Sequence, residues 1–292
     1  MKEIINEITE QFDIARDEAE SAVATLLDRS RAGLYLGPEI DEQTKKMLQL
    51  RLRQLAKGIP IEYLIKQVQF RDYSLNVEPG VFIPRLETEY FVELVARMSN
   101  APRTILEIGT GCGGIAITLA EIFPAARIFA TDISVRAIEN ARRNIHKFGL
   151  SDRISLLCSN LCDALSTKFD LIISNPPYVP SPRLKFLPKS VKEYEPLQAI
   201  DGGKDGIGLI KRLIIQGFEN LNNNGLIGIE IDETSVDILK EFLDWNDIHS
   251  YVLKKDLFGR FRYLFVGNIK NETNKDTNQS KKASSAKDAK NR

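Results

Sequence analysis

The sequence contains few cysteines and few histidines, which limits the kinds of stabilising site that it can form. Its three cysteines, Cys112, Cys158 and Cys162, are too few and odd in number for a disulfide framework, and they suit a reducing compartment. Its two histidines, His146 and His249, are isolated from each other, so no zinc-like cluster is predicted. We therefore expect no metal site.

Long hydrophobic runs are also missing. Nowhere do 18 apolar residues stand together, and the opening residues Met-Lys-Glu-Ile-Ile-Asn-Glu are too acidic, with too short an apolar run, for a signal peptide. The prediction is a soluble, cytoplasmic protein with no membrane partner. We also expect a monomer, because a monomeric state requires no special sequence feature.

Charge of one sign is not in excess over the whole chain. The 40 basic residues balance the 40 acidic ones, but residues 270–292 hold seven Lys or Arg against three acids. This terminal segment therefore carries +4, and residues 1–269 carry −4. Such a balance gives no general case for a nucleic-acid-binding surface, so direct binding of nucleic acid is not expected.

Four segments of the 292-residue chain differ in composition, and the length exceeds that of one average domain. Residues 1–57 lack strand alternation and are predicted to form a small helical bundle. Residues 58–84 read as a β-hairpin linker, and residues 85–269 alternate between strand and helix patterns. Residues 270–292 are rich in Lys, Asn, Ser and Ala and are predicted to be a disordered polar tail.

The first segment has apolar residues at helical spacing and a candidate N-cap, Asp41, before its last helical stretch. Its nine basic and eleven acidic residues give a net charge of −2. Composition alone leaves open whether this bundle stabilises the rest of the chain or recognises a partner. The residues at helical spacing are Ile4, Ile5, Ile8, Phe12, Ala22, Val23, Leu26, Leu27, Met47, Leu48, Leu52 and Leu55.

The linker has two alternating stretches, residues 68–71 and 73–77, on either side of Asp72. A helix is predicted to follow, because Phe91 and the apolar residues after it recur at helical spacing. Arg85, just before that helix, reads by itself as a surface charge.

Strands and helices alternate from Thr104 onward, which is typical of a doubly wound α/β sheet. The last two predicted strands are separated mainly by residues 256–260, so we expect a terminal antiparallel hairpin. The predicted strands are residues 104–108, 127–131, 154–157, 171–174, 226–230, 250–253 and 263–266.

A glycine-rich loop follows the first of these strands and opens a helix, where glycines let the backbone turn sharply and approach a ligand. Its spacing is ambiguous between two cofactors. Gly109, Gly111 and Gly114 satisfy the dinucleotide pattern G-x-G-x-x-G. Gly109, Gly111 and Gly113 satisfy the G-x-G-x-G pattern of S-adenosylmethionine enzymes.

Polar residues end the next two strands. Asp132 stands 19 residues after Gly113, where a carboxylate accepts hydrogen bonds from a ribose diol. The alternative for Asp132 is a cap of the following helix. Asn160 lies where an adenine edge would fall in such a fold, and a plain turn residue is the alternative reading.

The stretch Asn175-Pro176-Pro177-Tyr178 follows a buried strand and favours a methyl donor over a nicotinamide. A planar –NH₂ group is a poor nucleophile because its lone pair is delocalised. The Asn175 side-chain carbonyl and the Pro176 backbone carbonyl could each accept one of its N–H bonds, held rigid by two prolines, while the Tyr178 ring stacks on the plane. Such pre-ordered placement lowers the barrier to methyl transfer.

With these motifs, the sequence resembles the release-factor glutamine N5-methyltransferases, within the N-P-P-Y class of S-adenosylmethionine-dependent amino-methyltransferases. The resemblance extends from about Ala22 to Val266. The stretches that carry it, besides residues 175–178, are residues 60–64, 83–89, 195–196, 202–206, 230–231 and 255–262.

The resemblance implies a Rossmann-like catalytic domain, and an N-terminal helical domain that docks class I peptide chain release factors. It implies that S-adenosylmethionine is the methyl donor and that the glutamine of the factor's Gly-Gly-Gln loop is methylated. The implied glutamine-binding residues are Asn175, Pro176, Pro177 and Tyr178, which are also the catalytic ones, with Arg85 as a further substrate contact. The implied cofactor-binding residues are Glu107, Gly109, Thr110, Gly111, Cys112, Gly113, Asp132, Asn160, Leu161 and Asn175.

Four positions depart from the family pattern. The family usually has Gly at the position of Lys66, Pro at that of Leu86 and Gly at that of Asp232, and it often has Asp at that of Asn160. Two other functions stay open as alternatives. One is methylation of an exocyclic amine of a nucleobase, and the other is a binding protein that keeps the fold without turnover. The acidic bundle argues against the first, and the intact glycine loop against the second.

Overall fold

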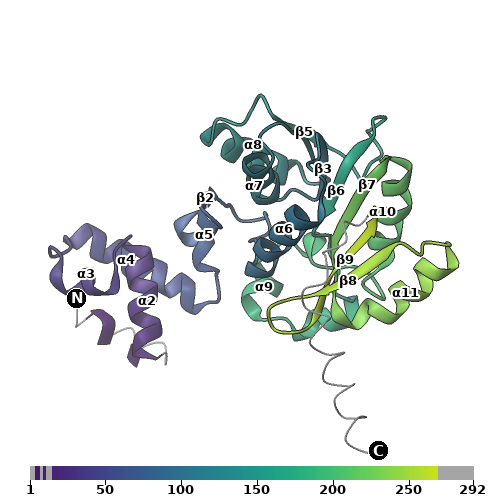
Figure 1. Cartoon of the computed structure of the whole chain (residues 1–292). Coiled ribbons are helices and arrows are strands. Elements are labelled where there is room, and N and C mark those ends of the chain that lie inside the picture. Colours follow the sequence, from purple (N-terminus) through teal and green to yellow (C-terminus); the bar gives the residue numbers. More distant parts are fainter. Residues whose placement is uncertain (1–3, 7–8, 11–14, 269–292) are drawn as a thin grey trace, which may run out of the picture.

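A computed structural model describes residues 4–6, 9–10 and 15–268. The predictions for Ile8, Phe12 and the tail 270–292 therefore lie outside the described residues. Figure 1 shows a small helical part at the N-terminal end and a larger α/β part, with a short helix and a two-stranded hairpin between them.

The N-terminal part is a bundle of α2 (Arg16–Leu26), α3 (Arg31–Leu36) and α4 (Glu42–Ala56). Asp41 begins α4 as predicted, because its carboxylate accepts the Thr44 N–H at 2.7 Å. The helix α3 was not singled out by the sequence pattern, and it begins at a second cap, where Ser30 Oγ accepts the Gly33 N–H at 3.0 Å. The buried apolar residues of the bundle include Ile4, Ile5, Val23, Leu34, Leu48 and Leu52.

The short helix α5 (Ile61–Ile65) connects the two parts through two different faces. Ile61, Leu64 and Ile65 pack against the bundle core. Tyr63 is buried in the core of the larger part, and its hydroxyl donates to the Val81 carbonyl at 2.7 Å. The predicted hairpin follows as β1 (Gln67–Phe70) and β2 (Tyr73–Asn76), which pair antiparallel.

Lys66 ends α5 in the left-handed region, with φ 57° and ψ 29°. This conformation is costly for an L-residue with a Cβ and free of that cost for glycine. We expect Lys66→Gly to raise the free energy of unfolding by about 0.5–1 kcal/mol, since the relief exceeds the entropic cost of glycine. Denaturant unfolding measures this change.

The control for that substitution is Lys57→Gly, at the end of α4. Lys57 has an ordinary φ of −78°, so glycine relieves nothing there and should lower stability. Equal destabilisation by the two substitutions would contradict the argument from backbone strain.

The larger part contains a seven-stranded sheet in the order β5-β4-β3-β6-β7-β9-β8. Neighbouring strands from β5 to β7 pair parallel, whereas β9 is antiparallel to both β7 and β8. The doubly wound sheet and its terminal hairpin are thus confirmed. The strands are β3 (Thr104–Ile108), β4 (Arg127–Asp132), β5 (Ile154–Cys158), β6 (Phe169–Ser174), β7 (Leu221–Glu230), β8 (Tyr251–Lys255) and β9 (Phe261–Gly267).

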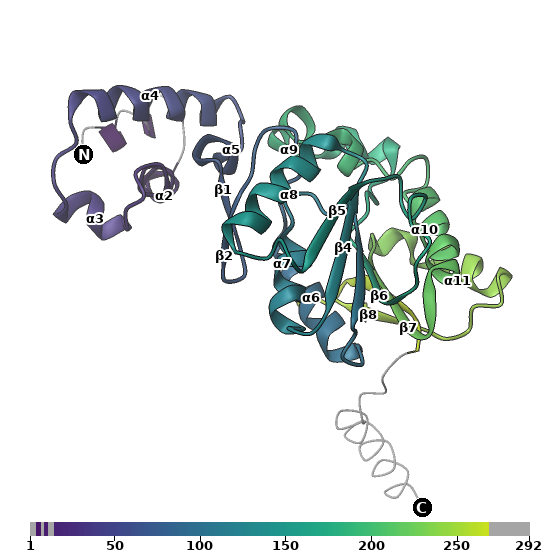
Figure 2. The ribbon, with the colours of Figure 1, turned by 90° about the horizontal axis from the view of Figure 1, so that it is seen from above.

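Helices cover both faces of this sheet, as Figure 2 shows. Successive strand residues point to opposite faces, so Ile105 packs with α6, α7 and α8 whereas Leu106 packs with α10 and α11. These helices are α6 (Leu86–Met98), α7 (Gly114–Ile122), α8 (Val135–Lys147), α10 (Gly208–Glu219) and α11 (Val236–Trp245). Shorter helices in the connections are η1 (Ser181–Phe186), α9 (Lys189–Tyr194), η2 (Leu197–Ala199) and η3 (Glu233–Ser235).

The strand order reverses at β3, which lies between β4 and β6. At such a switch point the loops after the two central strands diverge to opposite faces and leave a crevice at their carboxyl ends. Here those loops are the glycine loop after β3 and the Asn-Pro-Pro-Tyr stretch after β6. They come close, because a Cβ on Gly109 would lie 3.9 Å from the Asn175 carbonyl oxygen.

Candidate active site

The glycine loop forms one wall of a cavity of about 640 Å³ at this crevice. Gly109 has a φ of +79°, and Gly113 begins α7 with a φ of +90°. The positive φ of Gly113 favours glycine, and a Cβ there would also make a tight contact of 3.3 Å with the Ala141 Cβ. The loop therefore turns directly from β3 into α7 and exposes backbone to the cavity.

Asp132, the last residue of β4, connects this loop to the next helix. Its Oδ2 accepts the Gly111 N–H at 2.9 Å, and its Oδ1 accepts the Ser134 N–H at 2.9 Å. Burial raises the pKa of the Asp132 carboxyl, although these backbone hydrogen bonds oppose the shift. Asp132 lines the cavity and keeps further lone pairs for hydroxyl donors.

Glu107 lies beneath the loop and is 1% exposed. Its Oε2 accepts the Thr110 hydroxyl at 2.8 Å, whereas its Oε1 has no hydrogen-bond partner among the described residues. Burial raises the pKa of this carboxyl to about 8. A buried acceptor without a donor at a cavity wall indicates a place for a ligand that carries positive charge or N–H and O–H groups.

The remaining predicted cofactor residues also lie at this cavity. Cys112 is buried, with the pKa of its thiol raised to about 12 by burial, so it contributes its backbone and not a thiolate. Its carbonyl accepts the Asn144 Nδ2–H at 2.8 Å. Asn160 and Leu161 line the cavity after β5, and Leu161 has a φ of +50°.

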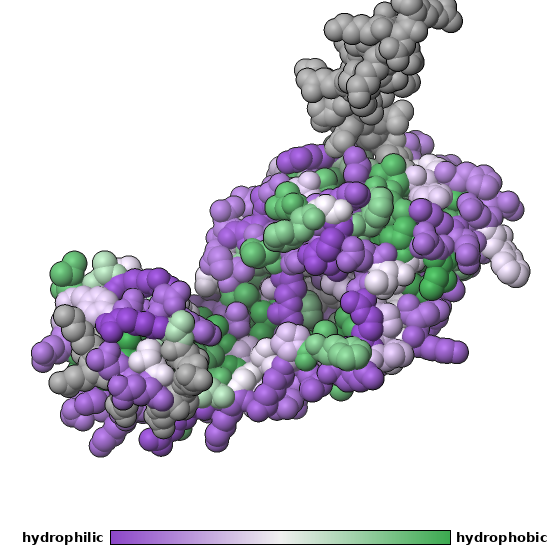
Figure 3. All heavy atoms as spheres, turned by 90° about the horizontal axis from the view of Figure 1, so that it is seen from below, coloured by the Kyte–Doolittle hydropathy of each residue, from purple (hydrophilic) through white to green (hydrophobic). Residues whose placement is uncertain are grey.

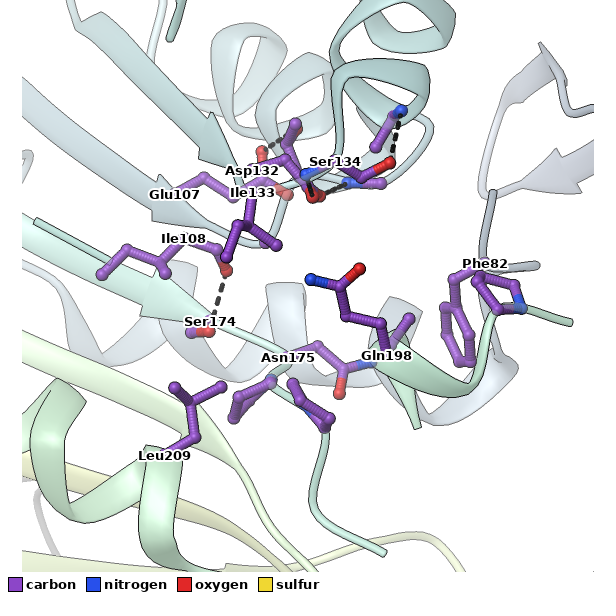
Figure 4. Close-up of a pocket in the computed structure, with 18 of the residues that line it drawn as sticks. Phe82, Glu107, Ile108, Asp132, Ile133, Ser134, Ser174, Asn175, Gln198 and Leu209 are labelled. Carbon is purple, nitrogen blue, oxygen red and sulfur yellow. Dashed lines mark hydrogen bonds between the residues drawn. The ribbon is translucent and has the colours of Figure 1, made fainter. Parts of the chain in front are cut away.

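Three residues outside the predicted set also face this space. Figure 4 shows the Gln198 side chain, from η2, extending between Asn175 and the Asp132–Ser134 segment, with the Phe82 ring at the side. Leu209, at the start of α10, lies on the Asn175 side of the same space. The sequence held no chemical signal for these residues, since loops far apart along the chain bring them together.

Asn175, Pro176 and Pro177 line the cavity directly after β6. Ser174, the last residue of that strand, donates its hydroxyl to the Ile108 carbonyl at 2.8 Å and so ties β6 to β3. The Asn175 Nδ2 donates to Thr88 Oγ1 at 2.9 Å. Its side chain is therefore held from the side of α6.

The Tyr178 hydroxyl reaches the end of β7. Its hydroxyl donates to Glu230 Oε1 at 3.1 Å, and the Thr88 hydroxyl donates to Glu230 Oε2 at 2.9 Å. Burial and the Glu230 carboxylate raise the pKa of Tyr178, so its hydroxyl stays protonated. Two of the predicted site residues, Tyr178 and Gly113, are not among the described residues that line the cavity.

Arg85 follows Pro84, which lines the cavity, but Arg85 is not among the described residues of the lining. Its guanidinium forms an ion pair with Glu195, which is 6% exposed. The guanidinium carbon also lies over the Phe82 ring, 4.8 Å from the ring centroid. Glu195 Oε2 also accepts the Ile83 N–H at 3.3 Å. Arg85 thus ties the Phe82 segment to the loop that carries Gln198.

The structure therefore brings most of the predicted site residues to one cavity. Thr88 and Glu230 were missed, although both stand in stretches that carried the family resemblance. The described residues contain no group of three or more His, Cys, Asp or Glu side chains that could hold a metal ion. They also contain no helix long and apolar enough to cross a bilayer.

Comparison with known proteins identifies close relatives. Residues 73–186 match the family model of the methyltransferase small domain. The release factor glutamine methyltransferase of Dictyoglomus turgidum is 40% identical over 85% of this chain and 90% of its own length. That of Rhodopirellula baltica is 35% identical over 85% of this chain and 88% of its own.

Solved structures resemble the fold at lower identity. A methyltransferase from Pyrococcus furiosus has a TM-score of 0.51 at 20% identity and covers 75% of this chain and 98% of its own. The hMettl16 catalytic domain, solved with an RNA hairpin, has a TM-score of 0.55 at 17% identity and covers 77% of this chain and 83% of its own. These likenesses establish the methyltransferase fold.

Proposed function

The chain belongs to the release factor glutamine methyltransferase family, and we propose that it methylates the side-chain amide of the glutamine in the Gly-Gly-Gln loop of class I peptide chain release factors. The observation that carries this proposal is the meeting of Asn175 and Pro176 with the Gly109 loop at one cavity. A methyl donor and a planar amide can therefore be held side by side.

The residues of the first half of the cavity fit S-adenosylmethionine. Asp132 offers carboxylate oxygens to a ribose diol. Glu107 Oε1, for which the structure describes no hydrogen-bond partner, offers an acceptor to a cationic ligand. Asn160 and Leu161 would flank the adenine. When bound there, S-adenosylmethionine supplies an electrophilic methyl group on its sulfonium.

The residues of the second half fit a carboxamide. The Asn175 Oδ1 and the Pro176 carbonyl each accept one N–H of the glutamine side chain, and the two prolines keep these acceptors rigid. Two such hydrogen bonds favour pyramidal geometry at nitrogen and direct its lone pair toward the methyl group. With S-adenosylmethionine bound, its methyl group would pass from sulfur to this nitrogen, and the nitrogen, then acidic, would lose its extra proton to water.

We also propose the four segments 1–57, 58–84, 85–269 and 270–292 as functional units, with the first as the docking domain. In support, the bundle has its own core and reaches the larger part through α5. Figure 3 shows apolar side chains between the bundle and the larger part, and further apolar groups among the hydrophilic side chains of the larger part. A folded protein partner suits such a mixed surface.

The experiment that tests this function incubates the enzyme with tritiated S-adenosylmethionine and, separately, purified release factor, DNA and ribosomal RNA. We expect label on the release factor alone, and none on a factor whose Gly-Gly-Gln glutamine is replaced by alanine. Label on either nucleic acid, or undiminished label on the altered factor, would refute the assignment.

A further inference from the structure

Thr88 and Glu230 form a hydrogen-bonded chain that ends on the Asn175 side chain. Thr88 lies in the first turn of α6 and is 2% exposed, and Glu230 is the last residue of β7 and is fully buried. Asn175 Nδ2 lies 2.9 Å from Thr88 Oγ1, which lies 2.9 Å from Glu230 Oε2. This series of hydrogen bonds therefore leads from the wall of the cavity into the protein interior.

The chemistry of these groups fixes the direction of each hydrogen bond. An ionised carboxylate only accepts, so the Thr88 hydroxyl must give its single proton to Glu230. Thr88 Oγ1 then has only lone pairs left for Asn175, and it can pair only with the amide N–H and not with the amide oxygen. A flipped Asn175 would bring two acceptors together.

We propose that Thr88 and Glu230 are positioning residues, which hold the Asn175 carboxamide with its Oδ1 free for the N–H of the substrate amide. This inference rests on the proposed function, because the acceptor is needed there for the N–H groups of the substrate amide. A flipped Asn175 would present N–H donors to a substrate that is itself a donor, and one of the two orienting hydrogen bonds would be lost.

The second carboxylate oxygen of Glu230, Oε1, also accepts a hydrogen bond. The Tyr178 hydroxyl donates to Oε1 at 3.1 Å, so the last residue of the Asn-Pro-Pro-Tyr stretch supports the first through the Glu230 carboxylate. The Arg262 guanidinium carbon lies 5.7 Å from the centroid of the Tyr178 ring. The other ionisable groups that act on Glu230 are Arg262 and Tyr263 on β9 and Glu87 on α6. Asp232 and Asp256 act on Arg262.

The orientation of the Asn175 amide should depend on pH, because it depends on whether Glu230 is protonated. Burial raises the pKa of Glu230 to about 7, against hydrogen bonds from Thr88 and Tyr178 that lower it. Below this pH the neutral carboxyl carries a proton that it can donate to Thr88, whose own proton is then free to turn to Asn175. The flipped amide becomes allowed, so kcat should rise with pH through about 7.

The test compares Thr88→Val and Glu230→Gln with the wild type on release factor at saturating cofactor. Loss of one orienting hydrogen bond should lower kcat about 10-fold, while the affinity for S-adenosylmethionine stays within about twofold. Thr88→Ser keeps a hydroxyl and should restore most of kcat. Ser99→Ala removes a buried hydroxyl at the far end of α6, which among the described residues bonds to the Val95 carbonyl, and it should leave kcat unchanged.

The pH profile of kcat separates positioning from a merely structural role. Glu230→Gln should lose the rise near pH 7 that the wild type shows. The cofactor is kept saturating because Glu107, whose pKa is also raised, lines the cofactor half of the cavity. A pH-dependent change in cofactor affinity then does not alter kcat. Unchanged kcat in Thr88→Val, no rescue by Thr88→Ser, or a wild-type rise that persists in Glu230→Gln would each overturn the proposal.

A measurement without substrate distinguishes this proposal from the function itself. The Asn175 side-chain N–H pair, observed by NMR in the free protein, should exchange slowly with water in the wild type and much faster in Thr88→Val. Slow exchange in both would refute the positioning role even if the factor is methylated. Failure of the wild type to label any release factor would refute the proposed function and leave the exchange result standing.

Discussion

Replacement of Asn175 by alanine is expected to lower kcat on release factor by about 10²–10³-fold, as loss of a preorganised hydrogen-bonding group does elsewhere. The substitution removes the only side-chain carbonyl in the Asn-Pro-Pro-Tyr stretch, and Asn175 lines the cavity together with the Gly109 loop. The Pro176 carbonyl alone can accept one N–H but cannot fix the amide plane. Single-turnover methylation with tritiated S-adenosylmethionine measures the rate.

Cofactor binding should persist in this variant, because Asp132, Glu107 and the glycine loop remain. Asn160→Ala is the matched control, since it removes another asparagine from the same cavity. It should weaken binding of S-adenosylmethionine with a much smaller effect on kcat. If Asn175→Ala lost cofactor binding and kept turnover at saturating cofactor, the proposed division of the cavity would be wrong.

The sequence predicted the sheet well because its strands are short apolar runs between turn residues. The centre of β6, for example, is an apolar stretch that ends at Asn175 and two prolines. The glycine loop and Asp132 were predictable for a similar reason, since local chain geometry alone places them at strand ends. The predicted strand 226–230 was shorter than β7, which begins at Leu221, because Asn222 to Asn224 carry no strand signal.

The support around Asn175 could not be predicted from local patterns. Thr88 and Glu230 are 142 residues apart, and their pairing depends on how α6 packs across the end of β7. The partner of the Tyr178 hydroxyl was hidden for the same reason. Arg85 reads as a surface charge in the sequence, whereas folding brings it to the buried Glu195. Long-range packing, not propensity, decides these contacts.

Deletion of residues 1–57 is expected to lower kcat/KM on full-length release factor by at least about 100-fold, equal to about 2.7 kcal/mol of lost binding. The bundle has its own core, so the chemistry of the cavity should survive its removal. The loss should therefore be in KM for the factor and not in affinity for the cofactor. The deletion exposes Ile61, Leu64 and Ile65, so the variant should also carry polar substitutions there.

A short peptide that contains the Gly-Gly-Gln sequence provides the matched substrate, because it fills the cavity without reaching a distant docking domain. Full-length and truncated enzymes should methylate this peptide at similar, low efficiency. Equal efficiency of both enzymes on the whole factor would assign the bundle a stabilising role only. A loss on factor and peptide alike, with an earlier thermal transition, would show that α5 needs the bundle to hold Tyr63 in the catalytic core.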